Sequence, residues 1–329
     1  MAADVTCLAL DAAHPGRVFL GTRHNGLHRS DDGGATWTLV SGEIGQPAVL
    51  ALAQDSAHPQ IYYAGALDGV YRRDDAGAQW TRVSSDKGQL MVQALAVGPN
   101  GSRVYAGTRS GLYISADGGA TWRWAEEDTA GIAIFNVVID PHDAGRIYAG
   151  SWGHNVLRSE DGGTTWAPIH NGLETLSAHA LAVDPADARR LYAGTVEAVY
   201  LSHDGGASWQ ASPLAGRPLT TFALVVDPAD PARVYAGATD GVYRSADHGQ
   251  TWQPVDHEGL GATVTALALL PDEAGTLLAG TEHQGLYAST DGGASWQPWG
   301  PSGVSVYAIL IDGQGTIWLG TDQGIFRAP

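Results

Sequence analysis

The sequence has little cysteine and few basic residues, and each shortage excludes a class of function. Cys7 is the sole cysteine among 329 residues, which excludes a disulfide framework and a cysteine-based zinc site. Lys and Arg total 18 against 35 Asp and Glu, which leaves a formal net charge of -17. This charge disfavours nucleic acid and anionic membranes as partners, because proteins bind both by neutralising phosphate groups.

Long apolar runs are absent as well. No stretch reaches the roughly 18 apolar residues of a membrane-spanning helix, and the start, MAADVTCLAL, lacks the basic and apolar regions of a signal peptide. We therefore expect a soluble protein, either cytoplasmic or exported with its signal removed. Cys7 lies in the apolar run VTCLAL, so we expect a small buried hydrophobe there rather than a nucleophile.

The sequence has a repeat instead. Its clearest element is the octapeptide SDDGGATW (30–37), which returns as RDDAGAQW (73–80), SADGGATW (115–122), SEDGGTTW (159–166), SHDGGASW (202–209), SADHGQTW (245–252) and STDGGASW (289–296). The aspartates of these boxes are Asp32, Asp75, Asp117, Asp161, Asp204, Asp247 and Asp291. They are 43, 42, 44, 43, 43 and 44 residues apart, and so constant a period indicates a repeat architecture.

Each repeat contains four short candidate strands. An alternating run such as ALAVDP is followed by one such as RVYAGT, then by a turn and GVYRS, and a few residues follow the Trp of the box. β-branched and aromatic residues with a period of two indicate strands, and no stretch has a helical period. Four strands in about 40–45 residues are typical of a β-propeller blade.

The number of blades follows from counting strands and boxes. The YAGT-like run occurs eight times and the box seven times within the 329 residues. We predict one all-β domain over 1–329, a single β-propeller of four-stranded antiparallel blades, with eight blades and a three-stranded last blade. A seven-bladed ring with displaced terminal strands is the alternative. The predicted blades span about 5–42, 49–85, 92–126, 134–170, 178–214, 220–257, 263–299 and 304–329.

The box pattern Ser-x-Asp-x-Gly-x-Thr-Trp resembles the Asp-box, or bacterial neuraminidase repeat (BNR), and the resemblance covers essentially the whole chain. The second box departs most, with Arg73 at the Ser position and Gln79 at the Thr position. The resemblance implies a propeller similar to those of sialidases, sortilin-type receptors and photosystem assembly factors. In such propellers the boxes serve structure, on the face opposite the functional site.

The residues of the box suit a tight turn between the third and fourth strands. Its aspartate can accept hydrogen bonds from backbone N–H groups just ahead, and glycines such as Gly34 and Gly119 permit positive φ. The tryptophans should begin the fourth strands and bury their rings between blades; they are Trp37, Trp80, Trp122, Trp166, Trp209, Trp252 and Trp296. A calcium loop is the alternative, but each box supplies one reliably placed carboxylate, so we predict no metal and no cofactor.

Candidate ligand-binding residues lie on the turns between second and third strands and on the connections between blades, because function in such scaffolds usually sits on loops. The repeats diverge most there, and the candidates are Trp152, His154, Asn155, Glu197, Asp240, Glu282, His283, Asp322, Arg109 and His24. An aromatic and polar cluster around blades three to five, with Trp124 and Phe135 beside Trp152, is the predicted pocket. The alternatives are ordinary exposed turns and a histidine metal site formed by His24, His154 and His283.

Two functions compete on this rim. The preferred one is a non-enzymatic, monomeric binding or assembly propeller for a protein, peptide or carbohydrate ligand, because no blade carries a long insertion. The other is a glycoside hydrolase or lyase that uses a pair of rim carboxylates. Sialidases also have an Arg-Ile-Pro motif, which is absent here, and Asp-box endo-xyloglucanases use two facing propellers where this chain has room for one.

Overall fold

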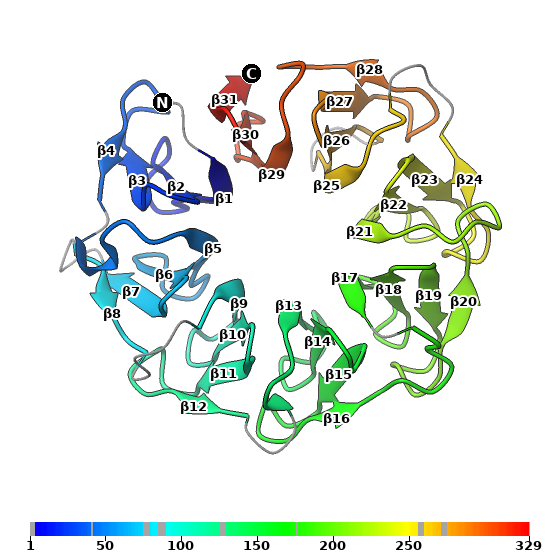
Figure 1. The fold of residues 1–329 in the computed structure, drawn as a ribbon, viewed down its shortest axis with the longest axis horizontal. Helices are drawn as coiled ribbons and strands as arrows, with labels where there is room; N and C mark the ends of the chain where they lie inside the picture. The colour runs from blue at the N-terminus through cyan, green and yellow to red at the C-terminus, as the bar shows by residue number, and fades with distance from the viewer. Residues whose placement is uncertain are drawn as a thin grey trace.

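Eight antiparallel sheets surround a central axis in the computed structural model, seven with four strands and one with three (Figure 1). The model describes residues 4–40, 42–74, 79–84, 90–125, 129–175, 177–255, 260–270 and 275–328. Asp75 of the second box lies outside these residues. The predicted eight-bladed all-β propeller with a three-stranded last blade is confirmed, and the seven-bladed alternative is wrong.

The strands of each blade run outward in chain order, so that blade one is β1–β4 and blade eight is β29–β31. The innermost strands are β1 (Val5–Leu10), β5 (Val49–Gln54), β9 (Val92–Val97), β13 (Ile134–Ile139), β17 (Ala178–Val183), β21 (Thr221–Val226), β25 (Val264–Leu269) and β29 (Val306–Ile311). The second strands are β2 (Val18–Thr22), β6 (Ile61–Ala66), β10 (Val104–Thr108), β14 (Ile147–Ser151), β18 (Leu191–Thr195), β22 (Val234–Ala238), β26 (Leu277–Thr281) and β30 (Ile317–Thr321).

The third strands have four or five residues and the fourth strands two or three. The third strands are β3 (Leu27–Ser30), β7 (Val70–Asp74), β11 (Gly111–Ser115), β15 (Val156–Ser159), β19 (Val199–Ser202), β23 (Gly241–Ser245), β27 (Gly285–Ser289) and β31 (Gly324–Ala328). The fourth strands are β4 (Thr38–Leu39), β8 (Thr81–Arg82), β12 (Arg123–Trp124), β16 (Ala167–Pro168), β20 (Gln210–Ser212), β24 (Gln253–Pro254) and β28 (Gln297–Pro298). One 3-10 turn, η1 (Gly42–Ile44), links blades one and two.

The core lies between neighbouring blades. Strands such as β10 and β18 are buried along their whole length, because each is covered by a blade on both faces. A glycine near the end of each second strand lets the next blade approach. At Gly194, for example, a Cβ atom would lie 2.8 Å from Cγ2 of Thr221 on the next inner strand and 3.1 Å from its carbonyl oxygen.

The boxes are turns between third and fourth strands, held by the aspartate. In the third box, Ser115 Oγ and the Thr121 N–H donate to Asp117 Oδ1, each at 2.8 Å, and Thr121 Oγ1 donates to Asp117 Oδ2 at 2.6 Å. The two glycines that follow the aspartate have φ of 66° and 85°. These bonds, that from the Thr121 hydroxyl above all, lower the pKa of Asp117 to about 2. The aspartates of the first, fourth, fifth, sixth and seventh boxes make the same set of bonds.

Each box packs on the blade before it, mainly through glycine and tryptophan. Tyr105 of blade three donates its hydroxyl to the Gly162 carbonyl of the fourth box at 3.1 Å. The box tryptophans immediately precede the fourth strands, and five are buried: Trp80, Trp166, Trp209, Trp252 and Trp296.

Trp37 and Trp122 are half-buried, so the expectation that every box ring is buried was wrong for these two. Trp37 faces Trp318 of blade eight edge-on, with ring centroids 6.5 Å apart, and the described residues of that blade form three strands. Trp122 instead stacks on Tyr113 of its own blade at 5.2 Å.

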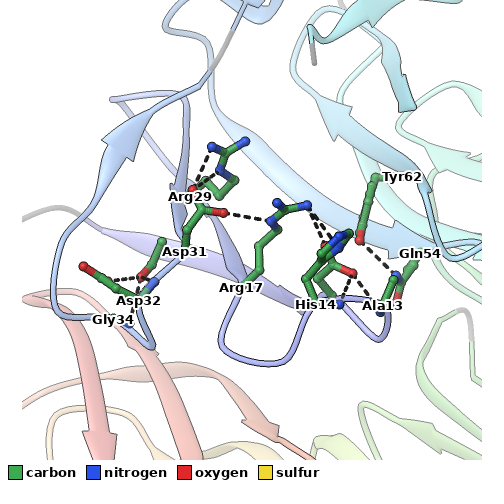
Figure 2. A network of polar contacts seen from close by, with 11 residues as sticks. Ala13, His14, Arg17, Arg29, Asp31, Asp32, Gly34, Gln54 and Tyr62 are labelled. Carbon is green, nitrogen blue, oxygen red and sulfur yellow. Dashed lines mark hydrogen bonds and ion pairs between the residues drawn. The ribbon is translucent and has the colours of Figure 1, made fainter. Parts of the chain in front are cut away.

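A second acidic position stabilises the same face. Asp11 follows β1 and accepts hydrogen bonds from the N–H groups of Ala13 and His14 at 2.9 and 3.1 Å. Figure 2 shows Arg17 bridging this loop to the first box, with Nη1 3.0 Å from Asp11 Oδ2 and Nε 2.8 Å from Asp31 Oδ1. Equivalent aspartates follow five other inner strands and also accept loop N–H groups: Asp55, Asp140, Asp184, Asp227 and Asp312.

The N-terminal strand closes the ring against the last blade (Figure 1). Val5 of β1 lies against Gly320 of β30, where a Cβ atom would be 2.8 Å from the valine Cγ1. Cys7, on the same strand, packs against the core between blades one and two. Burial raises the pKa of its thiol to about 12, so Cys7 is a packing residue and not an activated nucleophile.

Candidate functional site

The rim opposite the boxes combines two parts of each blade. The turn between the second and third strands lies at the same end as the start of the inner strand, because β17 begins opposite the end of β18, with Ala178 paired to Thr195. Side chains near the start of each inner strand therefore lie beside the turns that the sequence singled out. The same pairing recurs in the other blades, for example Ile134 with Ser151 and Thr221 with Ala238.

Four rings form a continuous line on this rim across blades four to six. Phe135, His179 and Phe222 are each the second residue of an inner strand, β13, β17 and β21. The ring centroids of Phe135 and His179 are 5.2 Å apart and those of His179 and Phe222 are 5.9 Å apart. Trp152, in the turn after β14, meets Phe135 edge-on at 6.5 Å. These distances are those of favourable aromatic pairs. We call Trp152, Phe135, His179 and Phe222 the aromatic row.

The row is distinctive because of where it is exposed. Trp152 is 60% exposed and Phe222 is 37% exposed, and Val196 in the turn of blade five is also 37% exposed. Among the described residues these are three of only four exposed large hydrophobic side chains, the fourth being Leu39 at 48%. Blades other than four to six place mostly smaller or polar side chains at the same inner-strand position: Thr6, Leu50, Gln93, Thr265 and Tyr307. An apolar surface gathered in one sector is typical of a binding site.

Hydrogen bonds hold the row in place. The Asn136 amide donates to the His179 carbonyl at 2.8 Å, which ties blade four to blade five. The backbone N–H of Trp152 donates to the Ala133 carbonyl at 2.9 Å. Ser177 Oγ lies 3.3 Å from His179 Nε2, and burial lowers the pKa of that histidine. Burial therefore favours the neutral imidazole, which contributes an uncharged ring to the row.

Five of the predicted site residues lie in this sector. Trp152, His154 and Glu197 are exposed on the turns of blades four and five, whereas Asn155 is buried with φ of 55°. Asp240, in the turn of blade six, accepts a hydrogen bond from Arg217 at 2.6 Å and one from the Tyr243 hydroxyl at 3.1 Å. Burial and the nearby Asp240 raise the pKa of Tyr243 to about 12.

The other five predicted site residues lie elsewhere on the ring. His24 and Arg109 are exposed on blades one and three, and Glu282 and His283 are exposed on blade seven. Asp322 of blade eight accepts the Ser305 N–H at 3.0 Å. The predicted aromatic cluster, around blades three to five, therefore differs from the observed one in the blades that it covers. The aromatic surface spans blades four to six, and Trp124 packs against Tyr113 at the outside of blade three, with ring centroids 4.8 Å apart.

The rim carboxylates are dispersed. Glu197 and Glu282 are exposed on blades five and seven, and Asp240 and Asp322 already accept hydrogen bonds from neighbouring groups. A cavity of about 570 Å³ lies between blades seven and eight, and none of these carboxylates lines it. Within the described ranges, no three His, Cys, Asp or Glu side chains are grouped so as to hold a metal ion. Those ranges also contain no helix long and apolar enough to cross a membrane.

Comparisons with known proteins agree with the repeat and the fold. Residues 243–254 match the BNR/Asp-box repeat, and residues 300–323 match the two component regulator propeller. No curated protein matches the chain. The geometry shows an eight-bladed β-propeller, and the match at residues 243–254 places a BNR/Asp-box repeat at its sixth box.

Three solved structures similar to this chain are an enzyme, an extracellular domain and a propeller bound to a peptide. The GH74 enzyme of Niastella koreensis is 17% identical with a TM-score of 0.60, and the match covers 99% of this chain and 65% of the enzyme. The extracellular domain of the putative one component system BT4673 from B. thetaiotaomicron is 15% identical with a TM-score of 0.61, over 100% and 51% of the two chains. YCF48 bound to D1 peptide is 21% identical with a TM-score of 0.60, over 84% and 90%. One is an enzyme and one is peptide-bound, so the shared fold leaves the choice between catalysis and binding to the site.

Proposed function

We propose that the protein is a non-enzymatic binding propeller, and that its aromatic row holds a segment of a protein or peptide that carries aromatic and basic side chains. The observation that carries the proposal is the line of four rings in contact, of which Trp152 and Phe222 at its two ends are exposed. Aromatic anchors dominate binding energy at interfaces, and rings fixed on neighbouring strands lose little conformational entropy when they bind.

Charge indicates the second property of the ligand. The protein carries a formal net charge of -17, and the exposed carboxylate of Glu197 follows Val196 directly in the turn beside the row. A basic segment would be attracted to this surface, and an Arg or Lys side chain could stack on the exposed face of Trp152. The peptide-bound YCF48 supports the proposal only to the extent that a propeller of this fold can hold a peptide.

The proposal is tested with fluorescein-labelled peptides that combine Trp or Phe with Arg, and with matched peptides in which Glu replaces Arg. We expect saturable binding of the basic aromatic peptides, measured by fluorescence anisotropy, and an affinity that falls with added salt. Trp152→Ala and Phe222→Ala should each weaken binding roughly tenfold, or about 1.4 kcal/mol. The matched control is Leu39→Ala, because Leu39 is the one exposed large hydrophobe outside this sector within the described ranges.

A second arm addresses catalysis. The protein and a Glu197→Gln, Glu282→Gln double variant are incubated with polysaccharides and chromogenic glycosides. Turnover by the parent that disappears in the double variant would overturn the proposal in favour of a carbohydrate-active enzyme. Equal peptide binding by the parent, Trp152→Ala and Phe222→Ala would also overturn it, because the row would then carry no binding energy.

A further inference from the structure

The three inner-strand residues of the aromatic row share a bulge in the backbone. The pairing of β17 with β18 shifts register between Ala178 and Ala180, so that His179 between them is left without a strand partner. Phe135 and Phe222 are skipped in the same way on β13 and β21. A bulge re-aims the side chain of the extra residue, which explains how three residues inside strands can contribute rings to one rim surface. His179 is the middle ring of this group.

Polar side chains at the bulge position of other blades bond to the next blade. Thr6 of blade one donates its hydroxyl to a backbone carbonyl of blade two, and Thr265 of blade seven donates to a backbone carbonyl of blade eight at 2.5 Å. The imidazole of His179 instead lies between two rings. Phe135 is nearly parallel to it, with an angle of 23° between the planes, and Phe222 is tilted by 46°. Among the described residues, the nitrogens of His179 therefore bond to neither neighbouring blade, and their one hydrogen bond is within blade five.

Ser177 determines which nitrogen of His179 carries the proton. Oγ of Ser177 lies 3.3 Å from Nε2, and within the described ranges this is the one partner of that hydroxyl. Ser177 is only 3% exposed, and a buried hydroxyl that donates to nothing costs free energy. The serine therefore donates to Nε2, which must be unprotonated to accept. In the neutral ring that burial favours, the proton then lies on Nδ1.

The Nδ1 atom of His179 is open to a ligand. It makes no hydrogen bond with any residue that the structure describes, and it is not one of the buried polar atoms that lack a partner there. The nitrogen therefore reaches solvent within the row, whose two ends, Trp152 and Phe222, are exposed. An N–H group in that place can donate to a bound molecule.

We infer that His179 is the specificity-determining residue of the row, and that its Nδ1–H donates a hydrogen bond to a backbone carbonyl oxygen of the bound segment. This inference rests on the proposed function, which gives the segment aromatic and basic side chains. The side chains of Arg, Lys, Trp and Phe contain no strong hydrogen-bond acceptor, so the backbone carbonyl is the acceptor that such a segment offers. Rings alone would accept any apolar group, whereas one fixed donor among them selects a polypeptide whose carbonyl lies between its anchoring side chains.

The test removes the acceptor from the ligand and the donor from the protein. The ligand is the fluorescein-labelled peptide Arg-Trp-Gly-Phe-Arg with an amidated C-terminus, and sulfur replaces each backbone carbonyl oxygen in turn. A thioamide keeps the shape of the peptide bond and accepts hydrogen bonds more weakly. We expect one of these replacements to weaken binding to the parent protein roughly fivefold, measured by fluorescence anisotropy.

His179→Phe should abolish that difference between the oxygen and sulfur peptides. The variant removes the donor and keeps a ring, and phenylalanine already occupies the same position in both neighbouring blades, as Phe135 and Phe222. The matched control is Trp152→Ala, which should weaken binding of both peptides roughly tenfold and leave the ratio between them unchanged. Its ring meets Phe135 and takes no part in the hydrogen bond.

The outcomes separate this inference from the proposed function. A sulfur effect that is equal in the parent and His179→Phe, or absent at every position, would overturn the inference alone where Trp152→Ala still weakens binding. Binding that does not respond to Trp152→Ala, or no binding by the parent, would overturn the proposed function and the inference with it.

The tautomer of His179 gives a measurement that needs no ligand. Ser177 is a positioning residue, because it acts only through that tautomer. Long-range proton–nitrogen NMR spectra distinguish the two neutral forms of histidine, and the signals of His179 are those missing from His179→Phe. At about pH 7.5 we expect the proton on Nδ1 in the parent protein, and a shift of population toward Nε2 in Ser177→Ala, whose side chain cannot donate. A proton on Nε2 in the parent, or an unchanged tautomer in Ser177→Ala, would overturn the inference.

Discussion

The two faces of the ring use the same repeat in opposite ways. On the box face the side chains recur with their contacts, so that Asp117 and Asp161 each accept a hydrogen bond from a serine two residues before and a threonine four residues after. On the rim face the backbone recurs but the side chains change. The second residue of the inner strand is Thr6 in blade one and Phe222 in blade six.

This difference separates positions that hold the blades together from positions that the fold leaves free. A box residue contacts the preceding blade and its own turn, so a change there alters a junction. A rim residue can also meet the next blade, as Phe135 meets His179, but the side chain at that position differs from blade to blade. The sector in which consecutive blades all carry rings is therefore the sector that we assign to binding.

The sharpest way to test the comparison is to remove a buried box tryptophan. Trp166→Ala should lower the free energy of unfolding by about 3–5 kcal/mol, because its ring is 4% exposed and packs with Tyr105 and Ile114 of blade three. Trp37→Ala should cost clearly less, because its ring is only half-buried against Trp318 of blade eight. Urea unfolding followed by circular dichroism measures both. Equal losses would show that burial between blades does not set the contribution of the box tryptophan.

A smaller effect is expected when one carboxylate is removed from each face. Asp117→Ala should cost about 1–3 kcal/mol, because three hydrogen bonds that close the turn are lost. Glu197→Ala on the rim should change stability by less than about 0.5 kcal/mol, because that side chain is exposed. The same urea unfolding assay applies. Peptide affinity should respond in the opposite order, with Asp117→Ala close to the parent, and a reversed order in either assay would contradict the division of the two faces.

The fold could be predicted from the sequence because each repeat contains a turn that is formed by residues close to one another in the chain. Asp117, its hydroxyl partners and its two glycines form a turn whose parts all lie within seven residues. The same turn at a spacing of about 43 residues then determines the blade and its number of copies. The burial of Trp37 was predicted wrongly because it depends on blade eight, at the other end of the chain.

The aromatic row was predicted only in part. Trp152 and Phe135 belong to the predicted pocket, whereas His179 and Phe222 lie inside inner strands and were not among the candidates. Aligning the repeats and reading that one strand position would have revealed consecutive rings. Their contacts could not be derived in this way, because ring distances of 5.2 and 5.9 Å depend on the angle between blades.

The smallest expected effect is the loss of folding stability at low pH, which should depend on the box aspartates and not on the rim carboxylates. Four box aspartates, Asp32, Asp117, Asp161 and Asp291, have their pKa lowered from 3.8 to about 2, chiefly by hydrogen bonds from the Thr or Ser four residues ahead. A carboxyl whose pKa is lower in the folded state stabilises that state above its unfolded pKa and loses the contribution as the pH falls through the folded value. Stability should therefore decline between about pH 4 and pH 2.

The measurement is the urea midpoint at a series of pH values from about 5 down to 2.5. Asp291→Asn, which keeps the size of the side chain and removes its titration, should flatten this decline slightly, because one of the six box aspartates with a lowered pKa is lost. Glu197→Gln, the matched change on the rim, should leave the slope as in the parent. A steeper decline in Asp291→Asn, or a flattening by Glu197→Gln of the same size, would mean that the acid response does not come from the boxes. The hydrogen-bonded turns would then have to be held by something other than the charge of their aspartates.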